Sequence, residues 1–251
     1  MCEVVDGADD LLLAVRHRFR TGASAIKLMT SGGVISPVDP LGVPQYSAAE
    51  IRVMMEEASL RGSNATAHAY SPEAIRHSVL NGVRCIEHGN LPDAETARLM
   101  AENEVSLVPT VVTYDAMDRR GAEIGLTDVG PAKNREVLEA GRNAVGLAGD
   151  AGVRIGFGTD FMGELEDEQL EGLRLQCDAL GVFEACDRKR QPALHPAAGR
   201  LSLPWNPFVF AARERHTLPV PSFSGLSLSA PGHEVCTLSL LQKLLLNGRD
   251  R

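Results

Sequence analysis

The sequence predicts an α/β protein in which parallel strands alternate with helices. Two observations support this class. Short apolar runs alternate with amphipathic, helix-length segments over residues 1–181, and each stretch between two runs is long enough for the crossover that parallel strands need. At this point two closures of such a sheet remain open, a doubly wound open sheet and a (β/α)8 barrel.

The first helix is expected over residues 9–22. There Leu12, Val15 and Phe19 fall on one face of a helix, and Gly22 stands after the last of them. Apolar residues at this spacing form the buried stripe of an amphipathic helix, and a glycine commonly ends one. The chain therefore opens with a helix that can cover one side of a sheet.

The next two helices carry explicit start signals. Ser47 begins the helix predicted over residues 47–62, and Glu50 three positions later completes a capping box. The helix predicted over residues 71–82 has Pro72 in its first turn, where the missing N–H costs nothing. These signals give the predicted start of each helix and so the limits of the strands between the helices.

The strands are the apolar runs between these helices. Five are expected, at residues 24–29, 63–70, 83–90, 105–112 and 153–160, with the remaining helices at 92–104, 132–152 and 166–181. The glycines of the last strand's end, "GFGTDFMG", do not match the GxGxxG pattern of a dinucleotide-binding loop.

Residues 182–251 differ from this pattern and are expected to form an irregular tail. They hold seven of the 14 prolines, and they carry nine basic against five acidic residues in a chain whose net charge is −8. Only residues 237–248 look helical. Proline-rich, aperiodic sequence buries little apolar surface, so we expect the tail to be poorly ordered. The predicted domains are thus 1–181 and 182–251.

Composition narrows the class of partner. The net charge of −8 argues against nucleic acid and against an anionic membrane surface. The five cysteines are odd in number and form no CxxC pair, which is typical of free thiols in a reducing, cytoplasmic compartment. The N-terminus is acidic and the apolar run "LLLAV" after it is only five residues long, which fits neither a signal peptide nor a membrane span.

Polar residues stand at the ends of four predicted strands. They are Lys27, His68, His88 and Asp160. In a barrel the carboxyl ends of the strands converge on one mouth, where catalytic groups lie. Imidazole and carboxylate are ligands for zinc and related divalent ions. We therefore expect these four side chains to form a metal site.

Lys27 needs a separate explanation, because a protonated amine has only donors and cannot bind a metal. Burial beside cations would lower the pKa of Lys27 and free a neutral amine. A neutral amine can react with CO2 to give a carbamate, a carboxylate on a long arm that can bridge two metal ions. This chemistry requires lysine, since the guanidinium of arginine keeps its proton.

Each of these residues has a structural alternative. Lys27 could extend its ammonium to solvent from a sheet edge, His68 could be a satisfied core histidine, and Asp160 could cap a helix. Four such residues at equivalent strand ends make coincidence a poor explanation. Two tyrosines, Tyr70 and Tyr114, are weaker candidates for substrate binding at the same rim, with burial as the alternative.

In combination these segments resemble the amidohydrolase superfamily, and more narrowly its imidazolonepropionase-like and metal-dependent dipeptidase group, whose members include Xaa-Pro and Xaa-Arg dipeptidases. The matching text is "IKLMTSGGVISP", "QYSAAEIR", "AHAYSPEAIRHSVLNGVRCIEHGN", "VPTVVTYDA" and "GFGTDFMGE". The resemblance implies a (β/α)8 TIM barrel, of which this chain would supply strands 4 to 8, and a binuclear zinc centre that hydrolyses dipeptides or N-acyl amino acids.

By the same resemblance each candidate receives a role. Lys27 would be the carboxylated bridging lysine of the fourth strand, and His68 and His88 would bind the second metal from strands five and six. Asp160 would end strand eight, bind the first metal and act as general acid and base.

The sequence departs from the family pattern in one way that matters for activity. The family's first strand carries a His-x-His pair, and this sequence contains no His-x-His. An N-terminally truncated barrel with low or no activity is therefore one expectation, and a non-catalytic remnant that binds one metal or none is the alternative. Unpaired sheet edges in such a barrel favour self-association into a homo-oligomer.

Overall fold

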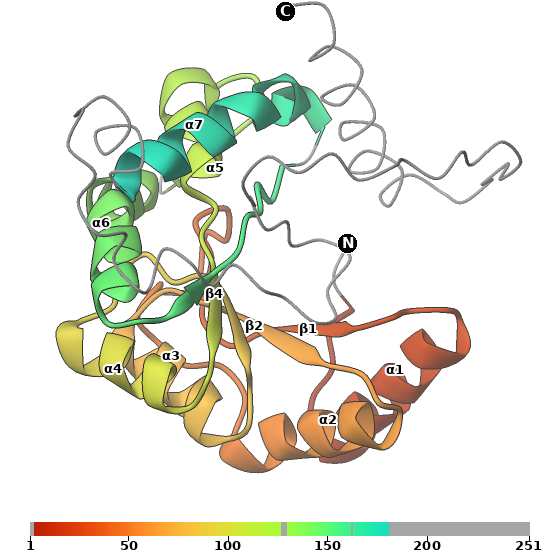
Figure 1. The fold of residues 1–251 in the computed structure, drawn as a ribbon. Coiled ribbons are helices and arrows are strands. Elements are labelled where there is room, and N and C mark those ends of the chain that lie inside the picture. Colours follow the sequence, from red (N-terminus) through yellow and green to blue (C-terminus); the bar gives the residue numbers. More distant parts are fainter. Residues whose placement is uncertain (1–2, 127–129, 162, 181–251) are drawn as a thin grey trace, which may run out of the picture. The chain divides into compact units, whose positions relative to one another are not determined.

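The computed structural model describes residues 3–126, 130–161 and 163–180, and these form an α/β unit (Figure 1). A five-stranded sheet lies at its centre. Its strands are β1 (Ile26–Met29), β2 (Ala65–Ala69), β3 (Cys85–His88), β4 (Ser106–Val108) and β5 (Arg154–Ile155). All neighbouring pairs are parallel, and the order in the sheet is the order in the chain, β1-β2-β3-β4-β5.

This strand order decides between the two closures left open by the sequence. A doubly wound sheet reverses its strand order at a switch point, so that its helices cover both faces. Here the order never reverses, and right-handed crossovers then place every helix on the same side of the sheet. Figure 1 shows the helices as an arc outside the strands. The fold is a partial (β/α)8 barrel, as predicted.

Eight helical segments accompany the strands in the described residues. They are α1 (Ala8–Arg20), α2 (Ala48–Leu60), α3 (Pro72–Leu80), α4 (Ala94–Glu102), α5 (Val111–Arg120), α6 (Gly130–Asp150), the 3-10 helix η1 (Gly163–Glu168) and α7 (Gln169–Ala179). The predicted capping box of α2 is present, because Ser47 accepts from the Glu50 N–H and Glu50 accepts from the Ser47 N–H.

Three expected elements differ from the observed ones. The strand expected over 105–112 ends at Val108, and the apolar residues from Val111 begin α5. Pro109 explains the break, since it has no N–H to extend a strand ladder. The last strand is only two residues long, and the helix expected over 166–181 is divided between η1 and α7. The tail expected at 182–251 lies outside the described residues.

The main core lies between the sheet and its helices. Outward-facing strand residues pack there against helical side chains, among them Leu28, Ile51, Met54, Ile75, Ile86 and Leu107. A second, smaller cluster lies beyond the carboxyl ends of the strands and includes Val34, Leu41, Tyr70, Tyr114 and Val137. Of the predicted stripe on α1, Val15 is buried and Phe19 partly buried, while Leu11 replaces Leu12 as the second buried residue.

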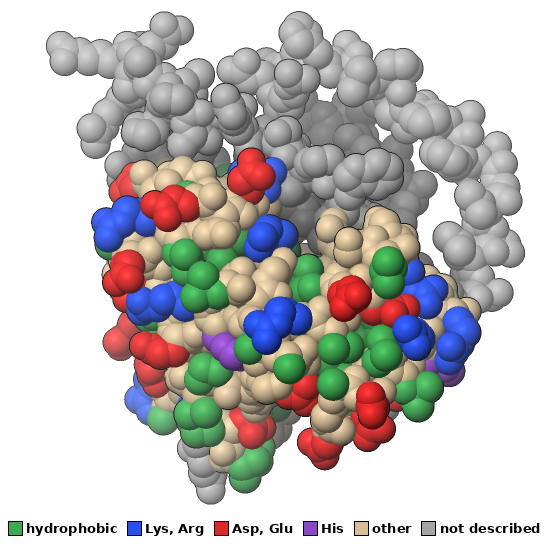
Figure 2. All heavy atoms as spheres, turned by 90° about the horizontal axis from the view of Figure 1, so that it is seen from below, with side chains coloured by type: hydrophobic (Ala, Val, Ile, Leu, Met, Phe, Trp, Pro, Cys, Tyr) green, Lys and Arg blue, Asp and Glu red, His purple; other side chains and the backbone are tan. Residues whose placement is uncertain are grey.

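The face drawn in Figure 2 carries basic and acidic side chains in a mixed pattern with isolated apolar ones between them. Leu60 and Leu80 are exposed at 76% and 68%. Single exposed leucines of this kind are normal on a solvated surface. Among the described helices, none combines the length and apolar character that a membrane crossing needs.

Candidate active site

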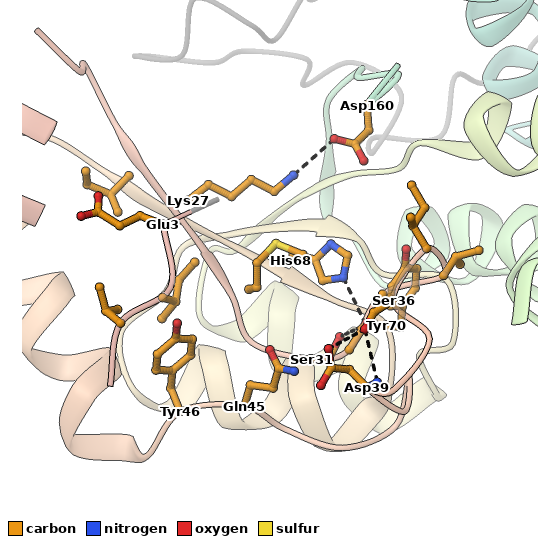
Figure 3. Close-up of a pocket in the computed structure, with 18 of the residues that line it drawn as sticks. Glu3, Lys27, Ser31, Ser36, Asp39, Gln45, Tyr46, His68, Tyr70 and Asp160 are labelled. Carbon is orange, nitrogen blue, oxygen red and sulfur yellow. Dashed lines mark hydrogen bonds and ion pairs between the residues drawn. The ribbon is translucent and has the colours of Figure 1, made fainter. Parts of the chain in front are cut away.

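The four residues predicted from strand ends lie together at one mouth of the sheet. Lys27 Nζ is 3.5 Å from Asp160 Oδ1, and His88 Nε2 is 3.9 Å from Asp160 Oδ2. The rings of His68 and His88 are 4.4 Å apart between centroids. A cavity of about 670 Å³ opens beside them, and Lys27, His68 and Asp160 line it (Figure 3). Residues up to 133 positions apart in the chain thus share one site.

Regular strand alternation places the first members of the site. On β1 the side chains of Ile26 and Leu28 are buried toward the helices, so Lys27 points to the opposite, concave side. Thr66 lies beside Lys27 in the β1–β2 register, and Glu87 lies beside His68 in the β2–β3 register. These side chains therefore reach the concave side through the ordinary period of two.

His88 and Asp160 are positioned by an unusual backbone conformation and not by strand alternation. Their φ angles are +73° and +52°, in the left-handed region that few residues other than glycine adopt. Because Glu87 and His88 are adjacent, a regular strand would send them to opposite sides of the sheet. The left-handed turn at His88 brings its imidazole to the same mouth as His68.

The carbonyl of Gly32 defines the state of His68. His68 Nε2 is 3.2 Å from this oxygen, which can only accept, so Nε2 carries the proton and Nδ1 has a free lone pair. Burial lowers the pKa of His68 to about 4, more than the Gly32 contact raises it. The imidazole is therefore neutral at physiological pH.

Thr110 and Tyr114 define the state of His88. His88 Nδ1 is 2.7 Å from Thr110 Oγ1 and 2.9 Å from the Tyr114 hydroxyl, and Thr110 donates to Tyr114 at 3.3 Å. A single N–H on His88 Nδ1, shared between the two hydroxyl oxygens, is compatible with all these contacts, and in that tautomer Nε2 is the lone-pair nitrogen. Nε2 is buried and has no hydrogen-bond partner among the described residues. Burial also holds the pKa of His88 well below its usual value.

Lys27 is held by carboxylates. Its ammonium is 2.7 Å from Glu87 Oε2 in addition to the contact with Asp160. Desolvation lowers the pKa of Lys27, but the two carboxylates outweigh it, and the pKa is raised above its usual value. This is opposite to the lowering expected beside metal cations, because the protein's own neighbours of Lys27 are anions.

Glu87, Thr66 and Thr110 are site residues that the sequence analysis missed. Thr66 donates to Glu87 Oε1 at 2.6 Å and so fixes the carboxylate that pairs with Lys27. A charged residue inside an otherwise apolar strand was the available signal for Glu87. Thr110 follows a proline in an apolar run and offered none.

Tyr70 and Tyr114 line the cavity but are almost fully buried, at 2% and 1% exposed. Their hydroxyls bond to each other at 2.8 Å. Burial raises the pKa of both phenols. Tyr70 also stacks on His88, with ring centroids 5.3 Å apart. Tyr70 therefore packs against both histidines, and Tyr114 packs against His88.

The donor set suits a divalent metal in its chemistry. Two neutral imidazoles each have one nitrogen engaged and one free, which is the usual state of a metal-binding histidine, and a carboxylate lies beside them. The buried Nε2 of His88 is otherwise unexplained. Within residues 3–126, 130–161 and 163–180, however, no group of three or more His, Cys, Asp and Glu side chains is placed to hold a metal ion.

Comparison with known proteins identifies the family. Residues 2–185 match the amidohydrolase family, so the chain belongs to it. Ochratoxinase of Aspergillus niger is 32% identical over 157 residues, which cover 62% of this chain and 32% of the enzyme. The barrel and the family expected from the sequence are thereby confirmed.

Solved structures give the same picture. A prolidase with bound N-methylphosphonate-L-proline is 44% identical, with a TM-score of 0.71 over 73% of this chain and 45% of its own. A Xaa-Pro dipeptidase with bound methionine is 28% identical, with a TM-score of 0.64 over 70% and 44%. The chain thus spans less than half the length of each of these relatives.

Proposed function

We propose that this chain carries part of the active site of a metal-dependent enzyme that hydrolyses the amide bond of a dipeptide or an N-acyl amino acid. The observation that carries the proposal is the state of the two histidines. His68 and His88 are neutral, each is fixed through one nitrogen, and each leaves the other free beside Lys27 and Asp160. The named activities of prolidase and ochratoxinase relatives support the same reaction class.

The residues that would hold the metal are Lys27, His68, His88 and Asp160. Zinc suits this mixture of imidazole and carboxylate ligands. Lys27 would take part as a carbamate formed with CO2, and two ions are expected in a complete site. When bound, the metal would acidify a water molecule and would polarise the amide carbonyl that this water attacks.

Asp160 is the proton carrier in this proposal. Desolvation raises the pKa of Asp160 above its usual value, against the lowering by Lys27. A carboxylate with a raised pKa is better matched to accepting and returning a proton. Asp160 removes a proton from the attacking water as the C–O bond forms, and it delivers that proton to the amide nitrogen as the C–N bond breaks.

The substrate is expected to be a small molecule. The cavity of about 670 Å³ has the size of a small-molecule site, and it lies directly at Lys27 and Asp160. In the structure the hydroxyl of Tyr70 is bonded to Tyr114, so a role in binding a substrate carboxylate or oxyanion would require this bond to be exchanged. Cytoplasmic placement stays a prediction from cysteine usage, and in the described part Cys85 and Cys177 are free thiols.

The alternative is a non-catalytic chain that binds one metal or none. It is supported by the missing His-x-His pair and by the lack of a three-donor group in the described residues. Zinc content after loading with zinc and bicarbonate, and turnover of a panel of dipeptides and N-acyl amino acids, separate the two. Zinc-dependent turnover that Asp160→Asn abolishes supports hydrolysis. Zinc binding without turnover favours the alternative, and failure to bind zinc contradicts the proposed metal site.

A further inference from the structure

Residues 31–45 form a loop that lines the cavity and is folded back on itself. Its two ends are joined, because Ser31 and Pro44 form a β-bridge and the Gln45 N–H donates to Thr30 O at 2.8 Å. Within the loop, Ser36 Oγ donates to Asp39 Oδ2 at 2.5 Å. Loop residues including Ser31, Ser36 and Asp39 line the cavity (Figure 3).

Lys133 of α6 fastens this loop from outside. Its Nζ donates to the carbonyl oxygens of Ser36 and Asp39, both at 2.6 Å, and to that of Gly33 at 3.3 Å. An ammonium has three donors, so all three are used on the loop. About 100 residues of chain separate the partners, and the lysine is the cross-link between α6 and the cavity wall.

The loop in turn contacts His68 directly. The Gly32 carbonyl is the acceptor for His68 Nε2, and a Cβ added at Gly33 would touch the His68 ring at 3.7 Å. Gly32 itself has no room for a side chain, because the carbonyls of Asp39 and Pro40 lie against it. Figure 3 shows the imidazole between this loop and the Lys27–Asp160 pair.

We infer that Lys133 is a positioning residue for His68. By fixing the loop it holds the Gly32 carbonyl on Nε2, keeps the proton on that nitrogen, and presents the lone pair of Nδ1 to the mouth of the barrel. The effect on metal binding rests on the proposed function, whereas the effect on the His68 proton does not. Lys133 bonds to three carbonyl oxygens of the loop and not to His68 itself, so its effect on His68 is transmitted by the loop backbone.

The test is nitrogen-15 NMR of histidine in the metal-free full chain, with His68 assigned by the loss of its signals in His68→Asn. Wild type is expected to show a slowly exchanging proton on His68 Nε2. Lys133→Met, which keeps the length of the side chain and removes its donors, is expected to lose that protection. Arg135→Met is the control, because Arg135 lies on the same helix and, within the described part of the chain, its one hydrogen bond is to Pro131 O of that helix.

Exchange protection that survives in a folded Lys133→Met, or that is absent from wild type, overturns the inference. Should Lys133→Met fail to fold, Lys133→Ala, which also removes the donors, is read in the same way, and retained protection in that variant overturns the inference. Zinc affinity is measured separately and is expected to fall about 10- to 100-fold in Lys133→Met, in line with other residues that orient a ligand. Loss of the proton signal in a protein that never binds zinc would support the inference and count against the proposed function.

Discussion

Replacing Thr110 with valine tests whether the hydroxyl beneath His88 orients that ligand. Thr110 is 2% exposed, and its Oγ1 contacts both His88 Nδ1 and the Tyr114 hydroxyl. Valine has nearly the same shape and the same β-branching, so packing changes little. Thr110 also stands at the start of α5 without a side-chain capping bond, so the substitution removes no cap.

The expected cost follows from those contacts. Two buried hydrogen bonds are lost, and the N–H of His88 keeps only Tyr114 as an acceptor, at 2.9 Å. Leaving a buried polar group poorly satisfied costs about 1–3 kcal/mol. With a urea slope of roughly 1–3 kcal/mol per molar, the unfolding midpoint should fall by about 1 M. Zinc affinity should fall as well, since the tautomer of His88 is no longer fixed from two sides.

The assay is urea unfolding of the metal-free chain, followed by fluorescence or circular dichroism. Thr21→Val is the matched control, because among the described residues the Thr21 hydroxyl bonds to exposed carbonyls at the end of α1, where water can replace it. That variant should change stability by no more than about 0.5 kcal/mol. If Thr110→Val unfolds at the wild-type midpoint and binds zinc as wild type does, the orienting role is wrong.

Three further outcomes are expected. Lys27→Ala should lose bound zinc and regain part of it when short carboxylic acids are added, whereas Lys27→Arg should not be rescued; full zinc binding by either unaided variant would exclude the carbamate. Burial raises the pKa of Glu57, but hydrogen bonds from Arg61 and Arg16 outweigh burial, and the pKa in the folded protein is below its usual value. The ionised Glu57 therefore stabilises the fold at pH above the unfolded-state pKa, and this stabilisation is lost as the pH falls through the folded-state pKa. Glu57→Gln should therefore melt lower at neutral pH, with the gap closing in acid; a gap that persists in acid would contradict this. Asp160→Asn should keep the fold, because asparagine tolerates φ near +52°, and should abolish any zinc-dependent turnover; retained turnover would exclude Asp160 as the proton carrier.

Much of the fold was predictable from local signals. The capping box at Ser47 and the proline at the start of α3 set helix starts within one residue of the observed ones. Pro109 signals the end of β4, but it does not announce α5, because Val111 and Val112 resume an apolar run that a strand could equally use. A short apolar run reads alike as a strand or as a buried helix, and only the tertiary packing of α5 against its neighbours decided between them.

The same distinction applies to the candidate site, where some residues could be predicted from the sequence and their partners could not. Lys27, His68, His88 and Asp160 could be predicted because each was assigned to the end of a predicted strand, and parallel strands bring their ends to one edge. In the structure His88 ends β3, whereas Lys27 is the second residue of β1 and Asp160 lies beyond the end of β5. Their partners could not, since Gly32, Thr110 and Lys133 come from loops and helices whose approach to the strand ends depends on how the whole unit packs. Sequence spacing identifies side chains that a regular strand or helix places at the site, but it does not predict contacts made by backbone carbonyls.

The dipeptide Glu87–His88 shows why alternation alone misassigns this site. A period of two allows only one of these neighbours to face the concave side, and the sequence analysis chose the histidine. In the structure both reach it, because β3 leaves the regular strand conformation at His88, where φ is +73°, and continues in the left-handed region at Gly89, where φ is +55°. Gly89 accepts that conformation without strain, and its N–H donates to Ala69 O at 2.9 Å, which ties the turn to β2. One strand end therefore supplies both the carboxylate that pairs with Lys27 and the imidazole that faces Asp160, so a change that straightened β3 would separate the counter-ion from the ligand even with every side chain still present.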